Sequence, residues 1–153
     1  MLLALFNEPV SDVAISGSAW VTPGIEDESR VDITFESGAR AHVFTSWVHP
    51  LKEQKLVVVG ESAMAVFEDS LQGPDKLRLY RYEMNMSGPE PKPIRGDFES
   101  IPFAQGEPLK NECQHFLDCI STNQTPRTDA DEALQVLAVL IGQSGSLSAA
   151  NPL

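Results

Sequence analysis

The sequence has few basic residues and no long apolar run. Its 11 lysine and arginine residues are outnumbered by 22 aspartate and glutamate residues, which gives a formal net charge of −11. Because phosphate backbones are bound by clustered cations, we expect no nucleic-acid partner. No apolar stretch approaches the roughly 20 residues that cross a bilayer, and Met1–Phe6 is too short and lacks the basic start of a secretory signal. We therefore predict a cytoplasmic protein without a membrane span.

Cysteine, histidine and glycine are too sparse or wrongly spaced for three kinds of site. Cys113 and Cys119 lie in one expected helix, where a rise of 1.5 Å per residue separates their Cα atoms by roughly 9 Å, too far for a disulfide. Such free thiols fit a reducing compartment. His42 and His49 fall on opposite faces of a regular strand, so we predict no metal site. No glycine-rich turn leads from an expected strand into a helix, so no cradle for a nucleotide pyrophosphate is predicted.

The length and composition of the chain fit one globular domain. A chain of 153 residues lies within the usual domain length, and 42% hydrophobic and 22% charged residues are ordinary values. The first two thirds has the alternation of strands, and the last third has the periodicity of helices. We therefore predict an α+β fold that covers residues 1–153 as a single domain.

Alternating apolar and polar residues predict about six to seven strands. Ser37-Gly38 offers a tight turn between two alternating segments, and Gly60-Glu61-Ser62 separates two more, so each pair is expected to form a hairpin. Prolines 89, 91 and 93 favour a loop over residues 87–96. The expected strands lie within about 10–103, at residues 13–21, 31–35, 39–49, 56–59, 63–67, 77–82 and 98–103.

Two helices are expected at about 107–122 and 129–150. Thr128 is the predicted N-cap of the second, whose middle from Ala133 to Ile141 is apolar almost all round. Such a helix must be buried on every side, so its outer side is expected to face a partner or a second copy of the chain. The first helix carries an apolar stripe that we expect to cover one face of the sheet: Leu109, Cys113, Phe116, Leu117 and Ile120.

The beginning of the chain also indicates that part of the surrounding structure is not encoded in this sequence. Met1–Phe6, followed by Asn7 and Pro9, has the pattern of the last turns of a helix, with Asn7 in the left-handed position. We interpret the chain as part of a larger protein.

One cluster suits a binding site. Trp47, His49, Pro50, Lys52 and Lys55 gather where the third expected strand ends, and together they offer an aromatic face, an imidazole and two ammonium groups. These groups could bind an anionic, ring-bearing ligand. The alternative is a core or interface tryptophan surrounded by surface lysines. The acidic run 26–28, between two expected strands, is predicted to be a solvated turn and not a cation site.

Several segments resemble the C-terminal domain of the glucose–fructose oxidoreductase/inositol dehydrogenase/rhizopine catabolism (Gfo/Idh/MocA) family. They are Ser46-Trp47-Val48-His49-Pro50, the stretch from Lys52 to Gly60, Met64–Asp69 and Thr125–Leu134. The nearest likeness is to the branch that oxidises UDP-N-acetylglucosaminuronate. This resemblance implies an open-faced, mainly antiparallel sheet with helices packed on one face, which forms part of a substrate pocket and a homo-oligomer contact through the sheet face.

The same resemblance implies what the chain lacks. Members of the family carry a glycine-rich nicotinamide-binding loop, a Glu-Lys-Pro segment with the catalytic lysine, and an aspartate/histidine pair just before the position matched here by Leu2–Pro9. None of these motifs can be placed on this sequence. The resemblance therefore implies no catalytic residue and no cofactor bound by this chain, with NAD(P) and an N-terminal Rossmann domain belonging to a full-length parent. Trp47, His49 and Lys52 would line or border the substrate pocket or the subunit contact.

Two functions from different classes follow. The first is the substrate-binding and oligomerisation domain of an NAD(P)-dependent sugar or sugar-nucleotide dehydrogenase, inactive by itself. The alternative is a stand-alone, non-enzymatic binding or scaffold protein that dimerises through its sheet. A hydrolase with a dispersed active site would need a nucleophile and a base, and nothing in the sequence indicates them.

Overall fold

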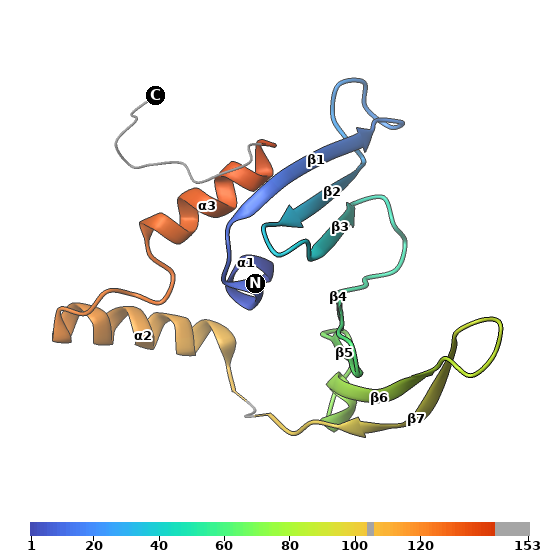
Figure 1. Ribbon diagram of the computed structural model, residues 1–153. Helices are drawn as coiled ribbons and strands as arrows, with labels where there is room; N and C mark the ends of the chain where they lie inside the picture. Colours follow the sequence, from blue (N-terminus) through green and yellow to red (C-terminus); the bar gives the residue numbers. More distant parts are fainter. Residues whose placement is uncertain (104–105, 143–153) are drawn as a thin grey trace. The chain divides into compact units, whose positions relative to one another are not determined.

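A computed structural model describes residues 1–103 and 106–142 and confirms the α+β class (Figure 1). Every strand pairing in these residues is antiparallel. The chain divides into two compact units: residues 1–49 together with the chain from Pro108 onward, and Pro50–Glu107. The seven strands of the described residues form two sheets, of three and four strands, where the sequence predicts one.

The first unit contains the three-stranded sheet β1-β2-β3. Its strands are β1 (Val10–Ser18), β2 (Glu28–Phe35) and β3 (Arg40–Ser46). The turn between β2 and β3 is the one expected at Ser37-Gly38, since Gly38 adopts a φ of 87°, a conformation that glycine accepts without steric cost. The predicted hairpin is therefore confirmed.

Helices α1 (Leu2–Phe6) and α3 (Ala130–Leu140) cover this sheet. Ile33 and Phe35 of β2 form a buried cluster with Val139 of α3, and the ring of Phe6 stacks on Phe35 with centroids 4.2 Å apart. Asn7 ends α1 in the left-handed conformation, with a φ of 49°, as the sequence predicts. Helices α1 and α3 thus pack on β2 in one small hydrophobic core.

Helix α3 differs from expectation at both ends. Its N-cap is Asp129, whose Oδ1 accepts a hydrogen bond from the backbone N–H of Glu132 at 2.9 Å, so the prediction of Thr128 is wrong by one residue. The helix ends at Leu140, and Gly142 follows it with a φ of 73°. The remainder of the predicted segment, residues 143–150, lies outside the described residues. Ala138 and Val139 are buried, whereas Leu137 and Leu140 are exposed, so this unit covers only one side of the helix.

Helix α2 (Pro108–Thr122) occupies the predicted residues but does not bury its apolar stripe. All five stripe residues are exposed, from Phe116 and Leu117 near 60% to Leu109 at 73%. The buried residue of α2 is Cys119. The expectation that this stripe covers the sheet is therefore wrong here, and α3 takes that place in the first unit.

The second unit is a four-stranded antiparallel sheet in the order β4-β5-β6-β7. The predicted second hairpin joins β4 (Lys55–Val59) and β5 (Ala63–Glu68), and the short helix η1 (Pro74–Lys76) leads into β6 (Leu77–Asn85). Strand β7 (Lys92–Ser100) begins inside the segment predicted as a loop, and Pro93 pairs with Met84. Since β7 is an edge strand of the sheet, a residue without an N–H donor is tolerated there.

Candidate functional site

Trp47 lies just beyond β3 and is 63% exposed. Its backbone N–H donates to the carbonyl oxygen of Asp27 at 3.2 Å, and its indole Nε1–H donates to the carbonyl oxygen of Glu26, also at 3.2 Å. Both bonds tie the tryptophan to the end of the loop between β1 and β2. The indole is therefore held in place and still accessible to a ligand or a partner.

The other two predicted site residues are also exposed. His49 ends the first segment of the first unit, and Lys52 lies in the second unit. The structure thus places Trp47 and His49 in one unit and Lys52 in the other.

Lys55 is less suited to binding an anion than the sequence suggests. Its Nζ lies 3.0 Å from Glu53 Oε1 and 3.8 Å from Glu68 Oε2. The hydrogen bond to Glu53, with the charge of Glu68, raises the pKa of the Lys55 ammonium above its ordinary value. An anionic ligand would therefore have to compete with Glu53 and Glu68 for this cation.

Asp27 is the residue that sequence reasoning placed wrongly. It was expected in a solvated turn, yet it is fully buried, and its Oδ2 accepts hydrogen bonds from the backbone N–H of Trp20 and of Val21, the latter at 2.6 Å. Its carbonyl oxygen accepts the bonds from Ser46 Oγ and from the N–H of Trp47. Asp27 therefore joins the loop after β1, through its carboxylate, to the end of β3, through its carbonyl oxygen. An acidic run in the sequence does not indicate this role.

Gly17 allows this loop to fold back closely on β1. A Cβ atom at this position would lie 2.8 Å from Glu26 Cγ and 3.0 Å from the carbonyl oxygen of Glu28. Contacts this short are not tolerated between such atoms, so a larger residue would push the loop away. The β1–β2 loop and Trp47 thus form one braced structure at this end of the sheet.

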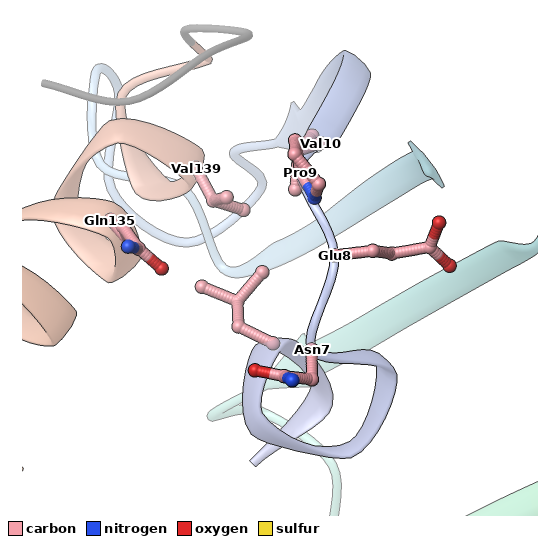
Figure 2. Close-up of a pocket in the computed structure, with 7 residues that line it drawn as sticks. Asn7, Glu8, Pro9, Val10, Gln135 and Val139 are labelled. Atoms are coloured by element: carbon pink, nitrogen blue, oxygen red, sulfur yellow. The ribbon is translucent and has the colours of Figure 1, made fainter. Parts of the chain in front are cut away.

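A cavity of about 390 Å³ lies within the first unit, between α1, the start of β1 and α3 (Figure 2). Figure 2 shows the side-chain amides of Asn7 and Gln135 directed into it. The sequence carries no signal for this cavity, because its walls come from opposite ends of the chain. Its lining residues are Leu3, Asn7, Glu8, Pro9, Val10, Gln135 and Val139.

The one charged residue of this lining faces elsewhere. Figure 2 shows the Glu8 carboxylate directed away from the amides of Asn7 and Gln135. It accepts hydrogen bonds from the backbone N–H of Ser37 at 2.9 Å and from Ser37 Oγ at 2.7 Å. Glu8 thereby fastens the segment after α1 to the β2–β3 turn and leaves the cavity lined by uncharged groups.

The described part of the chain lacks the Rossmann arrangement for binding a dinucleotide. In that arrangement a strand of a parallel sheet runs through a glycine-rich turn into a helix. Here all pairings are antiparallel, and Gly142 follows the end of a helix. Within residues 1–103 and 106–142, no group of three or more His, Cys, Asp or Glu side chains could hold a metal ion, and no helix is long and apolar enough to cross a membrane. Cys113 and Cys119 are both free, as predicted.

Comparison with known proteins agrees with this architecture. Residues 1–66 match the family model described as GFO/IDH/MocA C-terminal domain. No curated protein matches the chain.

Solved structures with a similar fold include sugar dehydrogenases. Two structures of UDP-N-acetylglucosamine 3-dehydrogenase GnnA from Acidithiobacillus ferrooxidans are each 20% identical to this chain and match 91% of it. The first has a TM-score of 0.67 and is covered over 41% of its length, and the second has a TM-score of 0.72 and is covered over 40%. Levoglucosan dehydrogenase in complex with NADH and L-sorbose has 16% identity and a TM-score of 0.59, over 87% of this chain and 42% of that one. The chain therefore spans about two fifths of the length of these structures.

The described residues form an α+β fold of antiparallel sheets and helices, which they share with part of these dehydrogenase structures. The particular resemblance, to the C-terminal domain of the Gfo/Idh/MocA oxidoreductases, is confirmed by the match over residues 1–66 and by the shared fold.

Proposed function

We propose that this chain is the substrate-binding and oligomerisation domain of an NAD(P)-dependent sugar or sugar-nucleotide dehydrogenase. The observation that carries the proposal is the alignment of nearly the whole chain with two fifths of GnnA and of levoglucosan dehydrogenase, together with the family match. Hydride transfer requires a nicotinamide held against the substrate carbon. Because the described residues lack a nucleotide cradle, the chain is inactive alone, and the rest of a longer parent supplies the cofactor and the catalytic groups.

The braced tryptophan supports the substrate-binding part of this role. An exposed indole whose Nε1–H is already bonded to Glu26 offers its ring to the apolar face of a sugar or to a base, at little cost in side-chain entropy. Trp47, His49 and Lys52 contact or border the substrate or a neighbouring subunit in this proposal, and none of them takes part in the chemistry.

Exposed apolar surface on the second sheet supports the oligomerisation part. Residues paired across neighbouring strands share one face of a sheet, and the pairs Val57–Val66 and Val66–Arg78 define such a face in the second unit. Val57 and Val59 on this face are 46% and 67% exposed. We name it the valine face; its apolar and aromatic members are Val57, Val59, Met64, Val66, Tyr80 and Phe98, of which Val66 is buried.

The size of the native protein tests the proposal. An antibody raised against this chain, used on a lysate of the source organism, is expected to detect a band of more than twice 16.7 kDa. DNA upstream of the Met1 codon should then encode, in frame, a glycine-rich loop and a Glu-Lys-Pro segment. A band at 16.7 kDa would instead support the stand-alone binding or scaffold protein.

An activity measurement gives a second, independent test. The purified chain, mixed with NAD⁺ or NADP⁺ and either UDP-N-acetylglucosamine or levoglucosan, is expected to give no increase in the absorbance of reduced nicotinamide. Cofactor reduction by the purified chain would overturn the statement that it is inactive alone.

A further inference from the structure

We propose that the cavity between α1 and α3 binds a neutral, hydroxyl-bearing ring compound of monosaccharide size. This inference does not rest on the proposed function, because a stand-alone binding protein would contain the same cavity. Its volume of about 390 Å³ is within the range of small-molecule sites and is ample for one sugar ring.

The walls of the cavity are held by the core of the first unit. Val139 of α3 is buried in the cluster with Ile33 and Phe35, and Leu3 of α1 packs against the same cluster. Glu8 is fixed by its two hydrogen bonds to Ser37. Since each wall is anchored to the same sheet, the cavity is largely formed before a ligand arrives, which lowers the entropy cost of binding.

Two uncharged polar groups converge on the cavity from different elements. The amide of Asn7 projects from the end of α1 and that of Gln135 from α3 (Figure 2). Within the described residues, neither side chain makes a hydrogen bond, so both retain their donors and acceptors for a ligand. A carboxamide both donates and accepts, and this dual capacity matches hydroxyl groups.

The electrostatics of the lining favour a neutral ligand. The lining contains no lysine, arginine or histidine, and its one carboxylate, Glu8, is engaged by Ser37 and directed away. A phosphate or an ammonium group would lose hydration here without gaining an opposite charge. Leu3, Val10 and Val139 provide apolar walls suited to the C–H faces of a ring.

Titration of the full 153-residue chain followed by NMR tests this inference. Glucose and N-acetylglucosamine are the neutral probes, glucose 6-phosphate is the anionic probe and glucosamine the cationic one. We expect a neutral sugar to shift the side-chain NH₂ signals of Asn7 and Gln135 saturably, and both charged probes to bind at least tenfold more weakly.

Two variants separate a binding role from a folding role. Asn7→Gly keeps a residue that accepts the left-handed conformation at the end of α1, and Gln135→Ala keeps a good helix former in α3. Each is expected to weaken neutral-sugar binding about tenfold or more while the backbone spectrum stays folded, whereas the control Gln124→Ala, outside the cavity, binds as the parent chain does. Absence of saturable shifts with both neutral sugars, tighter binding of a charged probe, or unchanged affinity in both variants would each overturn the proposal.

Discussion

At the scale of single residues, the buried carboxylate of Asp27 yields a prediction about stability. Replacing it with alanine leaves the N–H groups of Trp20 and Val21 without their acceptor. An unsatisfied, partly buried donor costs about 1–3 kcal/mol, so Asp27→Ala should lower the free energy of unfolding by roughly 2–4 kcal/mol. Urea unfolding followed by circular dichroism measures this loss.

Asp12 provides the matched control for that substitution. It lies exposed on β1, and Asp12→Ala should change the free energy of unfolding by no more than about 0.5 kcal/mol. Equal effects of the two substitutions would contradict the bracing role assigned to Asp27.

A second residue-scale prediction concerns the pair Arg30 and Asp32 on β2. The guanidinium of Arg30 bonds both carboxylate oxygens, with Nε 2.9 Å from Oδ2 and Nη2 2.9 Å from Oδ1. This hydrogen bonding lowers the pKa of Asp32, and the charge of His42, directly opposite on β3, adds a smaller effect in the same direction. Arg30→Ala should therefore raise the pKa of Asp32 toward its ordinary value.

The sign of the accompanying pH dependence follows from that shift. A carboxylate whose pKa is lower in the folded state stabilises the fold above its unfolded-state pKa, and the contribution is lost as the pH falls through the folded-state pKa. NMR titration of the Asp32 carboxyl carbon measures the change, with Arg81→Ala in the second unit as the control. A titration midpoint that does not move in Arg30→Ala would count against the pairing.

These residues also show where sequence reasoning stops. The sequence gathers Trp47, His49 and Lys52 within six positions, but nearness along the chain does not place them in one compact unit. The residues next to Asp27 in the sequence are those expected of a solvated acidic turn. Asp27 is buried only because its loop folds back onto β1. Asn7 and Gln135 come together through tertiary packing alone, for which a single sequence has no local signal.

At the scale of elements, the N-cap of α3 is open to a direct test. The side chain of Asp129 accepts the N–H of Glu132, whereas the sequence favoured Thr128 as the cap. Loss of an N-cap side chain costs about 0.5–2 kcal/mol. Asp129→Ala should therefore destabilise the chain by roughly 1 kcal/mol, and Thr128→Ala should have little effect in the same thermal or urea unfolding experiment. The reverse order would restore Thr128 as the cap.

Local patterns predict the elements well and their packing poorly. Both hairpins, α1 with its left-handed Asn7, and α2 lie where alternation, turn residues and apolar periodicity place them. The sequence predicts a loop at Pro93, because it does not reveal that this residue lies on an edge strand, where proline is tolerated. The stripe of α2 has the correct spacing for a buried face, but spacing cannot say whether the covering partner belongs to the same unit.

At the scale of the whole molecule, apolar surface remains exposed in both units. In the first unit it lies on α2 and on the outer side of α3, and in the second on the valine face. An apolar patch of this kind on a protein surface commonly marks an interface. The net charge of −11 opposes non-specific association, so these surfaces are expected to act through defined contacts.

The valine face yields the prediction at this scale. Light scattering should give the purified chain a mass that is a multiple of 16.7 kDa, and Val57→Lys with Val59→Lys should reduce it to a single copy. The reason is that two ammonium groups would replace the most exposed valines of this face, and charges buried without a partner in a contact are strongly unfavourable. Val21→Lys, an equally exposed valine of the first unit, is the control and should leave the mass unchanged. A parent chain that is already monomeric would contradict oligomerisation of this chain. A double variant that keeps its assembled mass with its circular dichroism intact would assign the contact to another surface, and α2 would be the next to test.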